Sequence, residues 1–126
     1  MDNALISFRV KVEHGCFIVR DAQGEEDVSE WDPTSENWYR SGSSVIFGVL
    51  PGSEGWVECE IWNKRPAVPL PINLISEEIL PNSGWMVVHD PSEHVWMKFR
   101  GAPDSVRISV LVNDFNFASK IQIIVE

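Results

Sequence analysis

Lysine and arginine are scarce in this sequence, and their scarcity excludes several functions. The chain holds 10 basic against 19 acidic side chains, for a formal net charge of −9. Proteins that bind nucleic acid replace phosphate counterions with lysine and arginine, and anionic membrane surfaces attract the same residues. The basic residues here are scattered, apart from one pair, Lys64-Arg65. We therefore expect neither nucleic acid nor a membrane among the partners.

Cysteine and long apolar runs are also rare. Two cysteines, Cys16 and Cys59, are too few for a disulfide framework, and no Cys-x-x-Cys pair is present. We expect two buried free thiols, with a bridge between them as the alternative. No apolar stretch approaches the roughly 18 residues of a membrane span, and no basic region followed by an apolar run marks an export signal. The sequence thus favours a cytoplasmic protein in a reducing compartment.

Familiar catalytic motifs are missing. The chain has no Gly-x-x-x-x-Gly-Lys loop for phosphate, no Gly-x-Ser-x-Gly elbow and no His-Glu-x-x-His zinc motif. Catalytic groups that meet only in the folded chain would escape this search. We nevertheless predict a non-catalytic protein without a cofactor.

Two groups of side chains resemble metal ligands without matching a known site. His89 and His94 would flank the tip of a predicted hairpin, where two imidazoles and a carboxylate can bind zinc, but no third histidine lies nearby. The carboxylates of residues 21–36 offer the oxygen ligands that calcium prefers, but their spacing matches no EF-hand loop. We predict no metal site.

Alternation of apolar and polar residues with a period of two runs through most of the chain and is typical of strands. Turn signals such as Pro51-Gly52 and Asp90-Pro91 recur at intervals of about ten residues. The length of 126 residues suffices for one core. We predict one domain over residues 1–126, an all-β antiparallel β-sandwich of eight or nine strands with at most one short helical turn.

The predicted elements follow from this pattern. Asp32-Pro33 suits the start of a helical turn that runs to Tyr39, and residues 76–83 are expected to be a polar connection. Pro69 and Pro71 remove backbone donors, so residues 67–75 are predicted to be an edge strand or a crossover. The remaining predicted strands are residues 5–12, 16–20, 44–50, 55–62, 85–89, 94–100, 105–112 and 120–125.

The negative charge is concentrated in one part of the chain. Between residues 21 and 60 there are ten acidic side chains and one basic side chain, Arg40, so this window carries −9. The remaining residues hold nine of each sign and sum to zero. Complementary charge raises encounter rates and rejects wrong partners, so we expect a basic protein as the partner.

Three large rings lie within or directly after the acidic stretch: Trp31, Trp38 and Tyr39. Neither dense like charge nor exposed rings stabilise a fold. One interpretation is a solvated connection whose tryptophans pack back onto the core. The other is a surface presented to a partner, with the rings as the buried anchors that carry most of the affinity.

The strand predicted at residues 55–62 has two unlike faces. One face is apolar, whereas Glu58 and Glu60 stand between Trp56 and Trp62 on the other. Carboxylates between two tryptophans argue against a core position, so this face extends the candidate surface. As an alternative, Trp56 and Trp62 form a stacking platform in a carbohydrate-binding or small-ligand-binding module.

The chain runs from Arg20-Asp21 through Glu30-Trp31-Asp32, Tyr39 and Gly42 to Val45-Ile46-Phe47, with Pro69, Gly84 and Phe99 further along. This order resembles the competence protein J family of small bacterial proteins. The resemblance covers most of the chain through scattered residues, and it departs from the family where Trp38-Tyr39-Arg40 replaces a Gly-Tyr pair and in two additional Trp-rich strands. Because a family member inhibits a nuclease involved in transformation, the resemblance implies an inhibitor without catalysis of its own. It supplies no contact residues.

Charge and resemblance together predict an acidic inhibitor, or immunity-type partner, that occludes the substrate groove of a basic nuclease. Carboxylates would replace substrate phosphates, and Trp31→Ala would weaken binding by on the order of 2 kcal/mol, more than the loss of any one rim carboxylate. The predicted partner-binding residues are Glu25, Glu26, Asp27, Glu30, Trp31, Asp32, Glu36, Trp38, Tyr39, Glu58 and Glu60.

Overall fold

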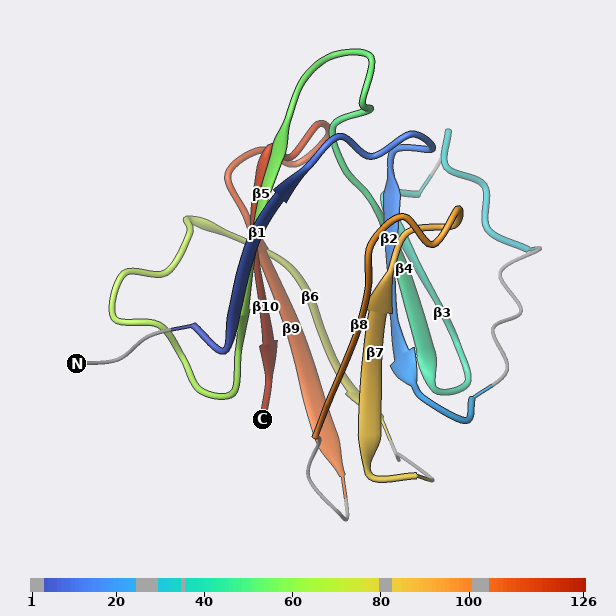
Figure 1. The fold of residues 1–126 in the computed structure, drawn as a ribbon, viewed down its shortest axis with the longest axis vertical. Helices are drawn as coiled ribbons and strands as arrows, with labels where there is room; N and C mark the ends of the chain where they lie inside the picture. The colour runs from blue at the N-terminus through green and yellow to red at the C-terminus, as the bar shows by residue number, and fades with distance from the viewer. Residues whose placement is uncertain (1–3, 25–29, 35, 80–82, 101–104) are drawn as a thin grey trace.

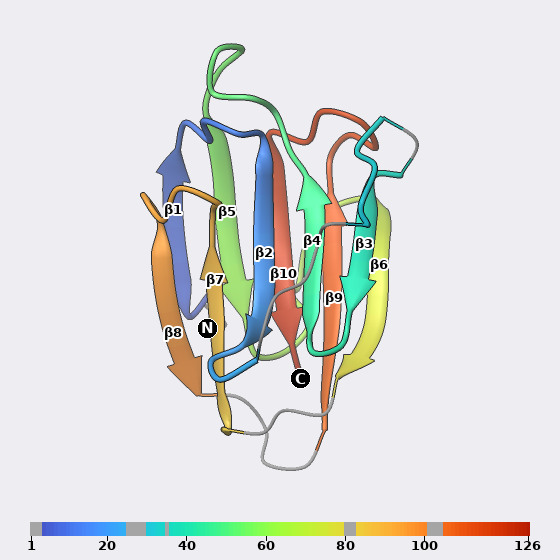
Figure 2. The ribbon, with the colours of Figure 1, turned by 90° about the vertical axis from the view of Figure 1, so that its right-hand side faces the viewer.

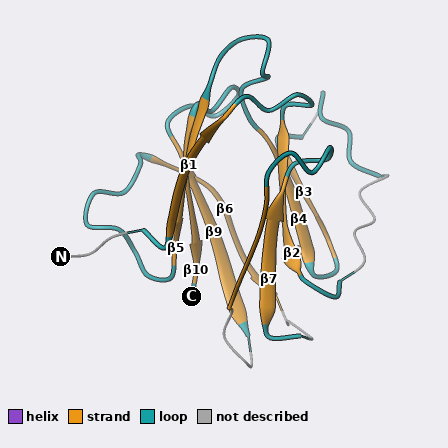
Figure 3. Ribbon diagram, in the orientation of Figure 1, coloured by secondary structure: helices purple, strands orange, loops and turns teal. Residues whose placement is uncertain are grey.

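Two five-stranded sheets packed face to face make up the computed structural model, which describes residues 4–24, 30–34, 36–79, 83–100 and 105–126 (Figure 1). Figure 3 shows only strands and loops in these residues. The prediction of an all-β sandwich is confirmed, with ten strands in place of eight or nine. The strands are β1 (Ile6–Val10), β2 (Cys16–Asp21), β3 (Trp38–Ser41), β4 (Ser44–Gly48), β5 (Val57–Trp62), β6 (Ile72–Ile79), β7 (Trp85–His89), β8 (Trp96–Arg100), β9 (Val106–Val112) and β10 (Lys120–Val125).

The strand order is β1-β5-β10-β9-β6 in the first sheet and β3-β4-β2-β7-β8 in the second. Neighbouring strands are antiparallel, as predicted, with one exception: β10 runs parallel to β5. In Figure 2 the edge strands β1 and β8 lie at one side of the sandwich, and β3 and β6 lie at the other. No helix long and apolar enough to span a membrane occurs in the described part of the chain.

The core lies between the sheets, where inward-facing side chains of both layers meet. Phe17 of β2 is fully buried, with its ring centroid 6.1 Å from that of Phe8 and 6.2 Å from that of Phe47. On β5 the alternation read from the sequence holds, since Val57, Cys59 and Ile61 are all buried in this core. Burial of one face of each strand is the main stabilising contribution to such a sandwich.

Two segments differ from the sequence prediction. Trp38 and Tyr39, expected at the end of a helical turn, open strand β3. Residues 67–71 form no strand, and β6 begins directly after Pro71 and runs to Ile79, into the predicted polar connection. Proline cannot donate to a ladder, so the pairing of β6 with β9 starts only at Ile72. The edge position expected for this segment is correct, because β6 pairs with β9 alone.

The crossover from β5 to β6 covers part of the outer face of the first sheet. Leu70 from this crossover packs against a second apolar cluster, to which Trp62 belongs. Gln122 of β10 fastens the crossover, because its side-chain oxygen accepts a hydrogen bond from the backbone N–H of Leu70 at 2.8 Å and its Nε2 donates to the carbonyl oxygen of Val68 at 3.2 Å. This outer face is therefore partly closed.

Candidate functional site

The acidic stretch begins with a carboxylate that serves the fold. Asp21, at the end of β2, is fully buried. Its Oδ1 accepts hydrogen bonds from the backbone N–H of Ser83 at 3.2 Å and from the Ser83 hydroxyl at 3.0 Å, and its Oδ2 accepts one from the N–H of Gln23 at 2.9 Å. Buried charge is tolerated when donors satisfy it, and these donors tie the start of the stretch to the approach to β7. Asp21 is a structural group.

The described residues 31–34 and 36–37 form a single turn, where the sequence predicts a helical turn that runs to Tyr39. Oδ1 of Asp32 accepts hydrogen bonds from the backbone N–H of Thr34 at 3.0 Å and from its hydroxyl at 2.6 Å. The N–H of Glu36 donates to the carbonyl oxygen of Asp32 at 2.9 Å. The capping role of Asp32 is thus present, but the chain enters β3 directly afterwards, because side-chain bonds of this kind compete with a regular helix.

Trp31 anchors the turn to the outer face of the second sheet. Its half-buried ring packs against a small apolar cluster that contains Cys16, Ile18 and Ile46. Its indole N–H donates to the carbonyl oxygen of Glu36 at 3.0 Å, which closes the turn from the other side. The interpretation that a tryptophan of this stretch packs back onto the domain is therefore correct for Trp31, although part of its ring stays accessible.

Trp38 and Tyr39 point to opposite faces of β3. Trp38 packs against the main core, whereas Tyr39 joins Trp31 on the outer cluster. Both rings are half-buried. This alternation is the ordinary consequence of an extended strand, and it leaves the edges of both rings at one border of the sandwich.

A second segment, residues 113–118, meets the turn at this border. The side-chain amide nitrogen of Asn37 donates a hydrogen bond to the carbonyl oxygen of Phe115 at 2.7 Å. Phe115 and Phe117 are 56% and 62% exposed. We call residues 30–34, 36–37 and 113–118 together the acidic end; Figure 2 shows these segments at the same end of the sandwich, beside β3.

The sequence pattern did not single out the two phenylalanines, which lie between the strands predicted at residues 105–112 and 120–125. A usable signal existed, because Asp114-Phe115-Asn116-Phe117 places two large rings between polar turn formers that end strand β9. No local pattern shows that this loop lies beside Trp31 and Asn37, so the sequence alone could not assign the two rings to the same surface.

Two hollows open on the acidic end. One, of about 450 Å³, is lined by residues 36–40 and Phe115. The other, of about 220 Å³, lies between Trp31 and Phe117 and also borders Asn37. Both mix aromatic carbon with backbone and carboxylate oxygen. Shallow sites of this kind suit side chains of a partner protein better than an enclosed small molecule.

The acidic end carries several carboxylates, of which that of Glu36 lines both hollows. Glu30 and Glu36 are exposed, as are Asp32 and Asp114. The carboxylate of Asp114 accepts backbone N–H bonds from Asn116 and Phe117, and these bonds hold its pKa below the usual range. The sequence-predicted residues Glu25, Glu26 and Asp27 lie outside the described residues. The basic side chain of this region, Arg40, forms an ion pair with Glu77 of β6 at 3.3 Å.

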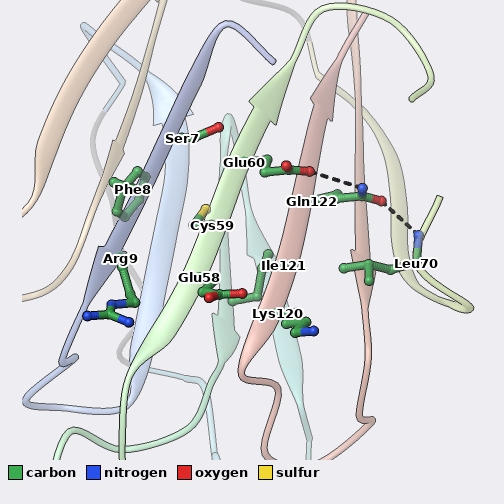
Figure 4. A pocket seen from close by; sticks show the side chains of 10 residues that line it. All are labelled: Ser7, Phe8, Arg9, Glu58, Cys59, Glu60, Leu70, Lys120, Ile121 and Gln122. Atoms are coloured by element: carbon green, nitrogen blue, oxygen red, sulfur yellow. Dashed lines mark hydrogen bonds between the residues drawn. The ribbon is translucent and has the colours of Figure 1, made fainter. Parts of the chain in front are cut away.

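Glu58 and Glu60 lie on the opposite outer face of the sandwich and do not join the acidic end. They belong to β5 of the first sheet, whereas Trp31 packs on the second sheet (Figures 1 and 4). In register across β1, β5 and β10, Glu58 stands between Arg9 and Lys120. Both of these neighbours are basic and come from the part of the sequence with no net charge. The single patch inferred from the sequence is two surfaces in space.

A hollow of about 510 Å³ lies on this opposite face, between β1, β10 and the crossover (Figure 4). Oε1 of Glu60 already accepts hydrogen bonds from the indole N–H of Trp62 and from Nε2 of Gln122, both at 3.1 Å. Two polar groups of this hollow, those of Glu60 and Gln122, are thus engaged in bonds that hold the crossover in place.

The tryptophan pair proposed as a sugar platform is also divided. Trp62 is only 7% exposed, beneath Leu70. Trp56 is 49% exposed, and the cationic groups of Arg9 and Lys11 lie 4.7 and 5.2 Å from its ring centroid. Sugar stacking requires open ring faces, so a platform made of both rings does not exist in the structure.

The histidine pair does not form a zinc site. His89 is buried, with its Nε2 accepting from Nε of Arg20 at 3.2 Å and its Nδ1 beside the carbonyl oxygen of Asp90 at 2.9 Å, whereas His94 is exposed. Because the Arg20 guanidinium can only donate, Nε2 of His89 accepts, and we assign the ring proton to Nδ1, which donates to the carbonyl oxygen of Asp90. Across the described ranges, no three His, Cys, Asp or Glu side chains are grouped as metal ligands.

Both cysteines are buried free thiols, as expected. Cys59 lies in the main core and Cys16 in the outer cluster of the other sheet, so no bridge joins them. Burial raises the pKa of the Cys16 thiol to about 11, with a further contribution from Asp90, and burial with the nearby Glu60 raises that of Cys59 as well. Thiols of this kind are unreactive near neutral pH.

The fold and this surface define a ten-stranded β-sandwich with an acidic, aromatic end. No known family model and no curated protein sequence matches the chain. Two solved structures are similar in fold. One is ComJ, inhibitor of the DNA degrading activity of NucA, from Bacillus subtilis, with a TM-score of 0.65 and 7% identity over 99% of this chain and 97% of that one. The other is crocagin biosynthetic gene J, with a TM-score of 0.53 and 14% identity over 97% of this chain and 94% of that one.

Proposed function

We propose that this protein is a non-catalytic inhibitor of a basic nuclease and that it occludes the substrate groove of that enzyme with the acidic end. The observation that carries the proposal is the grouping of four exposed carboxylates with large, partly accessible rings at one end of the sandwich. The similarity in fold to ComJ, an inhibitor of a DNA-degrading activity, supports the same class of function.

The chemistry of a nuclease groove suits this surface. A groove that holds DNA presents lysine and arginine to phosphates, and the carboxylates Glu30, Asp32 and Glu36 offer it the same charge. Rings such as Trp38 and Tyr39 supply apolar area that dehydrates the contact and slows dissociation. Glu25, Glu26 and Asp27 belong to the same stretch and extend this role in the proposal.

The partner surface is narrower in this proposal than the sequence predicts. Glu58 and Glu60 face away from the acidic end, and one groove cannot contact both outer faces of a sandwich. We therefore assign them no contact. A cytoplasmic location is part of the proposal, because two free thiols suit a reducing compartment.

The proposal is tested by titrating the purified protein into DNA-degradation assays with the basic nucleases of its source organism and with NucA of Bacillus subtilis as a reference. We expect stoichiometric inhibition of at least one enzyme, with an association rate that falls steeply as salt rises. Failure to inhibit any of these nucleases would overturn the proposed function.

A matched pair of variants tests the position of the site. Glu36→Gln removes one charge from the acidic end, and Glu58→Gln removes one from the opposite face. At low salt we expect the first to slow association roughly twofold and the second to leave it unchanged, since steering acts on the docking side. Equal effects of both changes would contradict the assignment of the docking surface.

A further inference from the structure

We propose that Phe115 and Phe117 are the apolar anchors of this docking surface, so that residues 113–118 form its second half and insert against the basic nuclease. This inference rests on the proposed function and names the residues that would hold the partner once charge has brought it close. Neither ring lies in the acidic stretch from which the site was first inferred.

Both phenylalanine rings are exposed to solvent. Phe115 and Phe117 are each more than half exposed. Single exposed apolar residues are normal on protein surfaces, whereas two exposed phenylalanines within three positions concentrate apolar surface in one short segment, as interaction sites do. Covering one phenylalanine removes an apolar area large enough to anchor an interface.

Hydrogen bonds hold the segment that carries the two rings. The side chain of Asn113 accepts from the N–H groups of Ser119 and Lys120 at 3.1 and 3.0 Å and donates to the Ser119 hydroxyl at 3.1 Å. The Asp114 carboxylate accepts from the N–H of Phe117 at 3.3 Å. With the bond from Asn37 to the Phe115 carbonyl, these contacts hold the backbone that presents the rings. Little ordering entropy is then lost on binding.

Each ring also lies beside a hollow. Phe115 forms one wall of the 450 Å³ hollow beside β3, and Phe117 forms one wall of the 220 Å³ hollow beside Trp31. Each ring therefore stands next to a recess that a side chain of the partner can enter. Protruding anchors beside recesses, inside a polar rim, match the usual build of an interface core.

Charge selects the occupant. Four exposed carboxylates, those of Glu30, Asp32, Glu36 and Asp114, belong to the same two segments as the rings, and Glu36 lines both hollows. An anionic lipid surface is repelled by such a rim, and so is the acidic end of a second copy of this chain. A protein whose surface combines lysine and arginine with apolar patches fits both the rim and the rings, as the border of a nuclease groove does.

The inference is tested with the double variant Phe115→Ala/Phe117→Ala and the control Trp96→Ala. Trp96 is 49% exposed on β8, at the opposite edge of the second sheet from β3. Because the replaced rings are exposed, all variants should unfold at nearly the same temperature as the wild type. The probe is the purified nuclease that the wild type inhibits most strongly, among those of the source organism and NucA.

We expect the double variant to bind this nuclease about 30-fold more weakly, with most of the change in the dissociation rate, and the control to bind as the wild type does. Inhibition by the wild type with equal affinity of the double variant would overturn the anchor assignment and leave the proposed function intact. Absence of inhibition by the wild type would overturn both. The wild type could also dimerise or bind phosphatidylglycerol vesicles. If the double variant lost either property but still bound the nuclease, the rings would serve another partner, and the inference would be overturned.

Discussion

Asn37 and Phe115 are 78 positions apart in the sequence, and a hydrogen bond of 2.7 Å joins the side-chain amide of the first to the carbonyl oxygen of the second. This bond links the two segments of the acidic end. At its other end the segment of residues 113–118 is held by the backbone N–H of Leu50, which donates to the carbonyl oxygen of Ala118 at 2.9 Å. The bond from Asn37 therefore makes one surface from two separate parts of the chain.

Replacing Asn37 with alanine should loosen residues 113–118 without disturbing the core. An exposed hydrogen bond contributes about 0.5–1.5 kcal/mol, so we expect faster amide hydrogen exchange in that segment and a small loss of global stability. Asn63→Ala, an exposed asparagine in the turn after β5, is the matched control. Unchanged exchange in residues 113–118 would show that the bond does not hold the loop.

Trp31→Ala should reduce stability as well as partner binding. Since Trp31 covers the apolar cluster of Cys16, Ile18 and Ile46, its loss should lower the free energy of unfolding by about 1–3 kcal/mol in urea titrations. Trp31→Phe retains most of the packing and loses only the bond from the indole N–H to Glu36, so its loss should be smaller. A stable Trp31→Ala variant would contradict the packing described.

Asp21→Ala should be the most damaging change within the acidic stretch. Removing this buried carboxylate takes away the acceptor of the N–H groups of Ser83 and Gln23 and leaves a gap in the fold, which should lower the free energy of unfolding by about 1–3 kcal/mol. Glu30→Ala removes an exposed carboxylate from the same stretch and should change it by less than about 0.5 kcal/mol. Similar effects of the two changes, measured by denaturant titration, would refute the structural role of Asp21.

Because both thiols are buried, we expect the protein to lose stability at alkaline pH. The pKa of Cys16 is about 11 in the folded chain against an ordinary value of 9.0, so the folded protein keeps the proton while the unfolded chain releases it. The free energy of unfolding should therefore fall as pH rises from about 9 to 11, by at most about 1.4 kcal/mol per pH unit for this group. Cys16→Ala should flatten the slope in part, because Cys59 retains its own contribution.

The same thiols should resist modification in the folded protein. A disulfide reagent at pH 8 should label neither cysteine before denaturation and both afterwards. Rapid labelling of the native protein would contradict the burial of Cys16 and Cys59.

Alternation and turn residues were sufficient to predict much of the fold. Trp85–His89 and Lys120–Val125 are strands with the predicted bounds, because turn residues or polar loops flank each of them. Strand β3 was missed because it has only four residues and follows Asp32-Pro33, a pair that favours a turn. The local preference of Asp32 predicted the turn correctly, but it carries no information about the pairing of β3 with β4.

The candidate site was less predictable, for a related reason. A period of two tells which side of a strand faces the core, and it placed Glu58 and Glu60 outward correctly. It does not tell which sheet the strand joins, so charges that are close in the sequence were assigned to one surface although they lie on two. Phe115 is the opposite case, because it is far from Asn37 in the sequence but lies on the same surface.

The parallel pairing of β10 with β5 bears on the order in which the chain assembles. Strand β10 lies in the middle of the first sheet, between β5 and β9. Until residues 120–125 have left the ribosome, no backbone hydrogen bonds can join β1 and β5 to β9 and β6, and the first sheet is incomplete. Long-range pairing of this kind slows folding, so nascent chains should depend on protection of the apolar face of β5 during synthesis.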